Sequence, residues 1–349
     1  MIYRTPEYCL DFRCIAGDCR DSCCKGWEID IDSETAEKYA AISGEFGERL
    51  RRSIKNNSFI LTEDVRCPFL NSEGLCDIYI NLGRESLCHI CSEHPRYFEW
   101  FGNVKEGGTG LCCEASAKLI LSRPFTLCEK EVPDEEASGD YDEELFSLLL
   151  ETRKAMLRVA NDKDIPIGRA LIQVLDIAEE TQQYIEIPGT LKRKVCYEKN
   201  TIKEIFRCFY ELEPIDASWL PYISKCEEAF PSAPPYSGEY NPYIRRIVSY
   251  FIFRYAMKSV YDGRILGYTV FAAVSAVFIS WLFRCSAVAE QPCGFEECAL
   301  IAKNYSKETE YCEENMEKLL ELFETEPFFA PEALKAVIAE SFGENVGEI

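Results

Sequence analysis

The residues in this chain that are best suited to chemistry are its cysteines, and most of them lie in the first third. Twelve of the 19 cysteines fall between Cys9 and Cys128, and the other seven are scattered singly over the rest of the 349 residues. The opening residues, MIYRTPEYC, have no basic segment followed by an apolar run, so we expect no secretory signal and a cytoplasmic location. Thiols stay reduced in that compartment, and clustered cysteines there indicate metal binding rather than disulfides.

The clustered cysteines form four groups whose spacing suits metal binding. The groups are Cys9-x4-Cys14-x4-Cys19-x3-Cys23-Cys24, Cys67-x8-Cys76, Cys88-x2-Cys91 and Cys112-Cys113, and both histidines, His89 and His94, lie beside the third. Four thiolates complete a shell for zinc or for an iron–sulfur cluster. No spacing matches a standard zinc finger, so the pattern leaves the metal and the number of sites open. A closed thiolate shell has no free position for a substrate, so a purely structural metal fits as well as a catalytic one. The seven scattered cysteines read as small buried hydrophobic residues.

Short elements of mixed type are expected to hold these groups. Apolar residues that alternate with charged ones predict strands, and turn residues such as Gly102-Asn103 predict hairpins. The predicted elements are a strand at 27–31, a helix capped by Asp32 or Ser33 that runs towards Arg52, strands at 59–70 and 75–80 around a turn at 71–74, a hairpin at 97–101 and 104–106, and a helix at 113–122.

The rest of the chain shows apolar residues at helical spacing. Helices are predicted near 143–160, 166–186, 200–212, 241–262, 265–284, 306–325 and 330–342, with a proline-rich loop at 230–242. Nine acidic residues crowd into 129–144, which reads as a solvated linker. We therefore predict an α-rich α+β protein: a cysteine-rich metal-binding module with short strands at 1–128, an acidic linker at 129–144, and a mainly helical domain at 145–349.

Charge and hydropathy narrow the choice of partners. A net charge of −22 repels phosphate backbones, so we expect no nucleic-acid partner; it suits cationic ligands, although solubility explains it equally well. Ile265 to Phe283 carries no charge and just reaches the length of a membrane span. It is the only such run and acidic helices flank it, so we interpret it as the central buried helix of the body and expect no membrane partner.

The cysteine groups, with their neighbours, resemble a known family. The matching segments are Phe12-Arg13-Cys14, Cys19-Arg20-Asp21-Ser22-Cys23-Cys24-Lys25-Gly26-Trp27, Cys67-Pro68-Phe69-Leu70, Gly74-Leu75-Cys76-Asp77-Ile78-Tyr79, Leu87-Cys88-His89-Ile90-Cys91-Ser92-Glu93-His94-Pro95-Arg96 and Cys112-Cys113-Glu114-Ala115. They resemble the flagellin lysine-N-methylase family, whose N-terminal region is similar to zinc- or iron-chelating proteins. Tyr250 to Tyr255 and Tyr261-Asp262-Gly263 resemble the helical part of the same family, with less specific motifs.

The resemblance implies an enzyme, a protein-lysine N-methyltransferase. It implies methyl transfer from S-adenosylmethionine to lysine ε-amines of flagellin as the partner protein, and a metal held by cysteines, an iron–sulfur cluster or alternatively zinc. By position, the implied metal ligands are Cys14, Cys19, Cys23, Cys24, Cys67, Cys76, Cys88, Cys91 and Cys112. Cys113 stands next to the last of these, and the sequence does not choose firmly between the two.

The residues themselves do not display a methyl-transfer site. The only glycine-rich stretch, Gly107-Gly108-Thr109-Gly110, lacks the context of a parallel sheet and reads as a loop. The three-cysteine spacing of the common radical enzymes that use the same donor is absent, because Gly26 stands where the third cysteine would be. No catalytic residue and no donor-binding residue is therefore assigned. Two other functions stay open: a non-enzymatic zinc- or iron-binding protein, and a redox sensor based on a Cys88–Cys91 disulfide.

Overall fold

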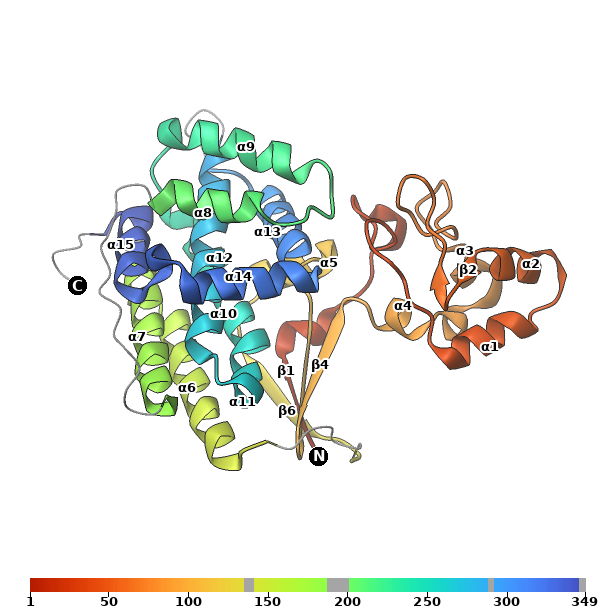
Figure 1. Ribbon diagram of the computed structural model, residues 1–349, viewed down its shortest axis with the longest axis horizontal. Coiled ribbons are helices and arrows are strands. Elements are labelled where there is room, and N and C mark those ends of the chain that lie inside the picture. Colours follow the sequence, from red (N-terminus) through yellow and green to blue (C-terminus); the bar gives the residue numbers. More distant parts are fainter. Residues whose placement is uncertain (135–140, 187–200, 288–291, 345–349) are drawn as a thin grey trace.

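The computed structural model describes residues 1–134, 141–186, 201–287 and 292–344. It is α-rich with a few short strands, which confirms the predicted fold class (Figure 1). The strands are β1 (Ile2–Pro6), β2 (Ile54–Lys55), β3 (Ser58–Phe59), β4 (Arg96–Phe101), β5 (Val104–Thr109) and β6 (Leu127–Glu131). The α-helices are α1 (Ser33–Ala41), α2 (Gly44–Arg52), α3 (Asp77–Leu82), α4 (His89–Glu93), α5 (Glu114–Ser122), α6 (Glu143–Asn161), α7 (Ile167–Ile185), α8 (Thr201–Tyr210), α9 (Trp219–Ala229), α10 (Asn241–Tyr255), α11 (Ser259–Asp262), α12 (Ile265–Cys285), α13 (Phe295–Glu310), α14 (Glu313–Thr325) and α15 (Pro331–Phe342).

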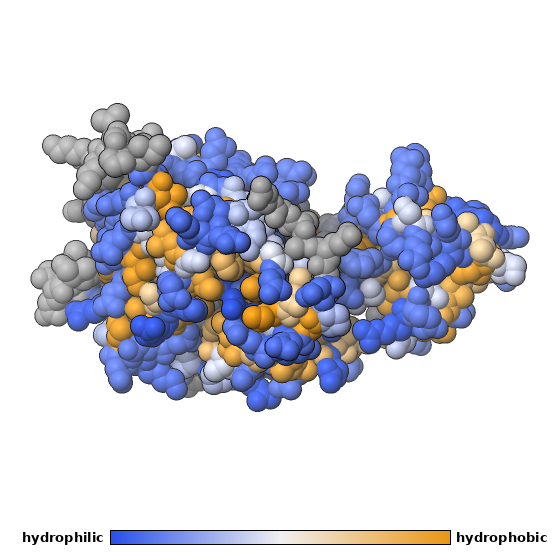
Figure 2. Space-filling view, turned by 90° about the horizontal axis from the view of Figure 1, so that it is seen from below, coloured by the Kyte–Doolittle hydropathy of each residue, from blue (hydrophilic) through white to orange (hydrophobic). Residues whose placement is uncertain are grey.

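Hydrophobic side chains form two separate cores. The smaller core contains residues between Cys24 and Cys91, and we call this part of the chain the small lobe. The larger core is mostly helical, but it also takes in Tyr8, Phe101, Leu111 and side chains of α5. We call the part of the chain around the larger core the body. The small lobe projects from one side of the body (Figures 1 and 2). The two cores therefore divide the chain differently from the predicted 1–128 module, and the predicted division at 129–144 stays a prediction.

A four-stranded sheet in the order β4-β5-β1-β6 lies in the body. The predicted hairpin is confirmed as β4 and β5, in which Phe101 pairs with Val104 across Gly102 and Asn103. Gly102 has a φ of +54°, which a side chain would disfavour. Residues 129–131, predicted as linker, instead belong to β6 and pair with β1, so that Ile2 faces Glu131. The local sequence could not predict this pairing, because the partner strand β1 lies at the start of the chain.

The predicted elements of the small lobe are partly confirmed. Asp32 caps α1 by accepting a hydrogen bond from the backbone N–H of Thr35 at 2.9 Å, as predicted. The helix towards Arg52 breaks at 42–43 into α1 and α2. The predicted strand at 27–31 is reduced to one isolated bridge, at Asp30.

The predicted strands at 59–70 and 75–80 are wrong, apart from Phe59, which is the second residue of β3. The turn at 71–74 does form, because the Asn71 carboxamide oxygen accepts bonds from the N–H groups of Glu73 and Leu75. The chain then enters the helix α3 with Asp77 in its first turn, where a carboxylate is favourable. An isolated bridge between Leu70 and Cys76 replaces the expected strand pairing.

The uncharged helix α12 forms the centre of the body, as predicted. By length and composition it could cross a membrane, but 94% of its apolar window is buried inside the protein. Helices α7, α10, α13, α14 and α15 pack around it. An apolar surface on all sides of a helix is what such an environment requires.

The other helices of the body differ from prediction mainly at two places. The helix α9 was not predicted, and the segment at 306–325 is two helices, α13 and α14, separated by Tyr311 and Cys312. The side chain of Asn315 satisfies the free end of α13 by donating to the carbonyl of Glu308 at 2.9 Å.

Candidate metal centre at the junction of small lobe and body

Five of the nine predicted ligands meet in the core of the small lobe. These are Cys24, Cys67, Cys76, Cys88 and Cys91, which we call the lobe set. The N–H of Cys67 donates to the carbonyl of Cys24 at 2.8 Å, and the loop between Cys67 and Cys76 closes on itself through the Leu70–Cys76 bridge. The thiols of Cys88 and Cys91 are hydrogen-bonded to each other, as a gap of two residues allows.

A second group of thiols lies where the small lobe meets the body. Cys14, Cys19 and Cys23 come from the N-terminal segment and Cys113 from the start of α5, and we call these four the junction set. The charge of Cys113 acts on Cys23, and the charges of Cys14 and Cys19 act on Cys113, so the thiols share one environment. Cys23 and Cys24 are adjacent, so the two sets are contiguous.

The structure places Cys113, and not Cys112, among the other thiols. Cys112 is buried in the body and its thiol is hydrogen-bonded to the hydroxyl of Tyr311. Cys113 directly precedes α5, without a side-chain capping bond, and is half-buried at the junction. The two neighbours point into different surroundings, a choice that the sequence left open.

The sets have the right donors for a thiophilic metal but not a finished coordination shell. No group of three or more His, Cys, Asp or Glu side chains within 1–134, 141–186, 201–287 and 292–344 is arranged to hold an ion as it stands. Four or five thiols per set nevertheless match the ligand chemistry of zinc and of iron–sulfur clusters. A bound metal would have to draw the thiols of a set together through rotation of their side chains.

Hydrogen bonds within the cysteine pairs make one thiol of each pair easier to ionise. The bond from Cys23 lowers the pKa of Cys24 to about 7, while the same bond and burial raise the pKa of Cys23. The bond from Cys91 likewise lowers the pKa of Cys88, while that of Cys91 is raised. A thiolate is the metal-binding form, so each pair offers one thiol that ionises more readily than an ordinary cysteine.

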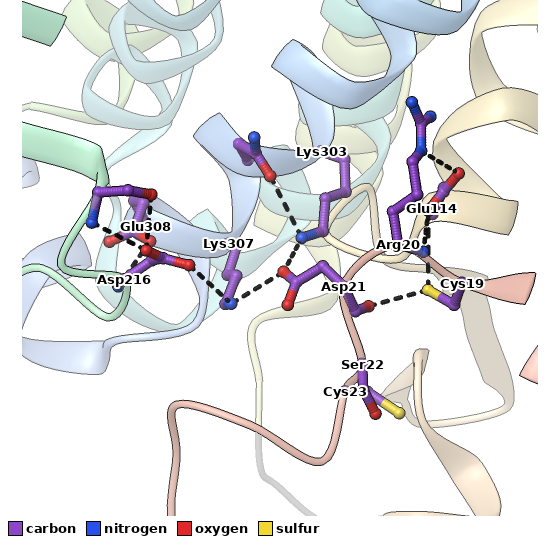
Figure 3. Close-up of polar contacts among 12 residues, drawn as sticks. Cys19, Arg20, Asp21, Ser22, Cys23, Glu114, Asp216, Lys303, Lys307 and Glu308 are labelled. Carbon is purple, nitrogen blue, oxygen red and sulfur yellow. Dashed lines mark hydrogen bonds and ion pairs between the residues drawn. The ribbon is translucent and has the colours of Figure 1, made fainter. Parts of the chain in front are cut away.

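Charged side chains fix the junction set against the body (Figure 3). Asp21, between Cys19 and Cys23, forms ion pairs with Lys303 and Lys307 of α13, the latter at 2.9 Å. Burial would raise the pKa of Asp21, but the two ammonium groups outweigh it and lower the pKa. The neighbouring Arg20 binds Glu114 of α5 through both its backbone N–H, at 2.9 Å, and its Nε, at 3.0 Å. Two body helices therefore position the segment that carries the cysteines.

Aromatic rings and a glycine complete the junction. Trp27 of the small lobe, His94 and Tyr311 of the body are in mutual contact, with ring centroids 5.0 to 5.8 Å apart. Gly26 has a φ of +88°, and a Cβ there would lie 2.9 Å from Cγ2 of Ile215. Only glycine allows the backbone to come this close to the body.

Neither histidine joins a thiol set. Burial, with a smaller contribution from Arg254, lowers the pKa of His94 to about 4, so its imidazole is neutral and serves the aromatic contacts. His89 is exposed, and its backbone N–H donates to Asp32. Their position beside the Cys88–Cys91 group is therefore not a sign of ligation in the structure.

Residues 107–109 of the glycine-rich stretch belong to strand β5 and not to the predicted loop, and Gly110 follows the end of that strand. A Cβ at Gly108 would strike the ring of Tyr97 at 2.5 Å, and one at Gly110 would approach the hydroxyl of Tyr311 at 2.8 Å. These glycines make room for tyrosine rings, and this packing explains the glycine-rich stretch without a nucleotide-binding loop.

The sequence prediction missed the residues that position the cysteines. Asp21 was quoted only as part of a motif, and Lys303 and Lys307 were not singled out. Their spacing of four residues on a helix places both ammonium groups on one face, and this spacing was the signal in the sequence that could have revealed a shared binding partner. Nothing in the sequence indicated that Asp21, more than 280 residues earlier, would occupy that face.

Comparison with known protein families finds two that match parts of this chain. The family described as FliB lysine N-methylase C-terminal domain matches residues 142–337, and a zinc- or iron-chelating domain family, CxxCxxCC, matches residues 13–106. The second match contains eight of the nine predicted ligands, all except Cys112.

Similar individual proteins cover a smaller part of the chain. A protein named lysine-N-methylase from Salmonella choleraesuis is 32% identical over 143 residues, which is 36% of this chain and 35% of that protein. Its counterpart from Salmonella typhimurium is 30% identical over the same length, and the flagellar biosynthetic protein FliU of Salmonella muenchen is 29% identical over 136 residues, 35% of this chain and 78% of that protein. The match thus spans about a third of the length of the two lysine methylases. No solved structure matches the chain.

Proposed function

Because this chain belongs to the FliB lysine N-methylase C-terminal domain family, we propose that it is a protein-lysine N-methyltransferase. The family match over residues 142–337, more than half of the chain, is the observation that carries the proposal. We further propose S-adenosylmethionine as methyl donor, flagellin as protein substrate and the cytoplasm as location. The names of the similar Salmonella proteins support the flagellar substrate.

The reaction makes defined demands on the protein. The lysine nitrogen must lose a proton, because an ammonium group has no lone pair. The nitrogen then forms a bond to the methyl carbon while the bond from that carbon to the sulfonium sulfur breaks, and the electron pair of that bond stays on sulfur. The net charge of −22 favours the approach of a lysine-bearing surface, since opposite charges steer association.

We propose that the lobe set and the junction set hold metal, as an iron–sulfur cluster or alternatively as zinc. The match to a zinc- or iron-chelating family and the convergence of nine thiols at two adjoining places support this. In the junction set we assign Cys113 in place of Cys112, on account of its neighbours. When bound, the metal would supply a cross-link between segments that few hydrophobic residues hold together. The ion pairs of Asp21 would keep the junction set in place against α13.

The activity is tested on flagellin itself. Flagellin should be purified from a host with and without the gene for this chain, and its lysines analysed by mass spectrometry. We expect added multiples of 14 Da on lysine only when the gene is present. Unchanged lysine methylation after deletion of the gene would refute the proposed activity.

The metal is tested on protein purified without oxygen. We expect iron with sulfide and an absorbance band in the visible, or zinc in a colourless protein. The paired changes Cys88→Ser with Cys91→Ser should empty the lobe set, and Cys19→Ser with Cys113→Ser should empty the junction set. Cys128→Ser, in β6 and outside both sets, is the control that should keep the full metal content. Retention of all metal by both paired variants would refute the ligand assignment.

A further inference from the structure

A cleft of about 360 Å³ lies between the start of α9 and the end of α13. Asp216, Ser218, Trp219 and Tyr222 line it from one side, and Asn304, Lys307 and Glu308 line it from α13. Lys307 also forms the ion pair with Asp21, so the cleft adjoins the segment between Cys19 and Cys23 (Figure 3). Its volume falls in the range of pockets for small ligands.

The lining of the cleft carries both signs of charge. Asp216 and Glu308 are acidic, whereas Lys225 and Lys307 are basic. A ligand that is only cationic, such as the side chain of a substrate lysine, would meet two ammonium groups. A ligand that is only anionic would meet two carboxylates. The lining therefore suits a zwitterion, with its carboxylate towards the lysines and its ammonium group towards Asp216.

One charged group at the cleft has no partner of its own. Trp219, at 3% exposed, belongs to the buried wall of the cleft. Lys225 is exposed and forms no ion pair with any described residue.

Glu308 gives this cleft its shape. It is buried, and its two oxygens accept the backbone N–H groups of Ile215, at 2.7 Å, and Asp216, at 3.0 Å. The loop before α9 is thereby tied to α13, and Asp216 is held at the rim 4.0 Å from Lys307. The acidic and basic partners for a zwitterion are thus fixed relative to each other.

We propose that this cleft binds the methyl donor, a sulfonium nucleoside with an amino-acid head group. Lys225 and Lys307 bind its carboxylate, Asp216 binds its α-ammonium group, and the ring of Tyr222 contacts its apolar and aromatic parts. This inference rests on the proposed methyltransferase function and adds the place where the donor binds. It also sets the donor beside the junction set, because Lys307 and Asp21 connect the two sites.

Calorimetric titration of the full chain, purified without oxygen, tests the assignment without relying on turnover. The titrants are S-adenosylmethionine and its demethylated product, S-adenosylhomocysteine. We expect the variants Lys225→Met and Asp216→Asn each to raise the Kd about tenfold for both titrants, because each loses a charge-assisted hydrogen bond. Lys203→Met on α8 is the control, since it removes the same charge outside the cleft and should leave the Kd unchanged.

The possible results separate this inference from the proposed function. If the unaltered protein binds the titrants and the cleft variants bind them equally well, the donor site lies elsewhere and the inference is overturned. If the variants keep the donor Kd and raise KM for a lysine peptide, the cleft receives the substrate instead, which also overturns it. If the unaltered protein binds neither titrant, the proposed function fails together with the inference. Lys225 is exposed, so Lys225→Met should fold normally, and an unchanged circular dichroism spectrum checks this.

Discussion

Glu106 of β5 forms the main ionic link between the sheet and the helices of the body. Its carboxylate binds Arg153 of α6 with both oxygens, at 2.6 Å to Nη1 and 2.5 Å to Nη2, and it also accepts from Nη1 of Arg4 at 3.0 Å. The side chains of Glu106 and Arg153 are 5% and 1% exposed. Arg153 therefore depends on a carboxylate out of reach of water, whereas Arg4 also binds Glu129.

The variant Glu106→Gln is expected to lower the free energy of unfolding by about 3–5 kcal/mol, because it leaves the buried Arg153 without its counter-charge. The neighbouring Glu129 provides a matched control. It binds the same Arg4 at 2.6 Å, but its side chain is 53% exposed. Glu129→Gln should therefore cost at most about 1 kcal/mol.

Thermal and urea unfolding, followed by the helical circular dichroism signal, compare the two variants. Burial would raise the pKa of Glu106, but Arg153 and Arg4 outweigh it and lower the pKa. The contribution of ionised Glu106 to the free energy of unfolding is therefore complete above the ordinary pKa of a glutamate and is lost as the pH falls below it. The difference in the free energy of unfolding between Glu106→Gln and the unaltered protein should shrink in acid. Equal losses for the two variants at neutral pH, or a loss below about 1 kcal/mol for Glu106→Gln, would show that the reasoning is wrong.

Three further predictions concern the junction, the cleft and a helix cap. Gly26→Ala and Gly44→Ala each place a side chain at a positive φ, +88° and +82°, but only the Cβ of Gly26→Ala would collide with the body, at 2.9 Å. The melting temperature of Gly26→Ala should therefore fall further than that of Gly44→Ala, and equal decreases would contradict the collision. Burial raises the pKa of Glu308 to about 7, so the folded protein holds an extra proton between the ordinary value and pH 7 and loses stability as the pH rises through that window. The urea midpoint, measured at pH 5, 6 and 7, should fall less steeply with pH in Glu308→Gln than in the unaltered protein. The same fall in both proteins would rule out Glu308 as the source of the decline. Asp32→Ala should lower the free energy of unfolding in urea by about 1 kcal/mol, because it removes the capping bond of α1. Ser43→Ala, at a helix start without a side-chain cap bond, should leave this free energy almost unchanged, and similar losses for the two variants would argue against the cap.

Local patterns in the sequence were sufficient for much of the fold. The 3.6-residue apolar period located α6, α7, α10 and α15, because a helix buries one face whatever surrounds it. The run without charge at α12 identified the centre of the body, since a helix apolar on all sides has to be covered on all sides. Asp32 as a cap and Gly102-Asn103 as a turn were likewise readable, because each acts on backbone groups within a few residues.

Errors arose where distant segments decide the local structure. The first residues of the acidic stretch, 129–131, join a strand because β1 offers them unpaired backbone groups. The residues after Cys76 form a helix because the Asn71 side chain closes the preceding loop early. The strand β1 lies far outside the window in which apolar alternation is read. Asn71 lies inside that window, but it acts through side-chain hydrogen bonds, which apolar alternation does not register.

The sequence by itself determined that the front of the chain gathers thiols and that the rear is a helical body, since both follow from residue types and their spacing. Only the tertiary structure decided which thiols meet. It turned Cys113 towards the junction and Cys112 towards Tyr311, although the two are neighbours in the chain. It also brought Asp21 to Lys303 and Lys307, because a buried ammonium group requires a carboxylate, and the fold supplied the one between Cys19 and Cys23.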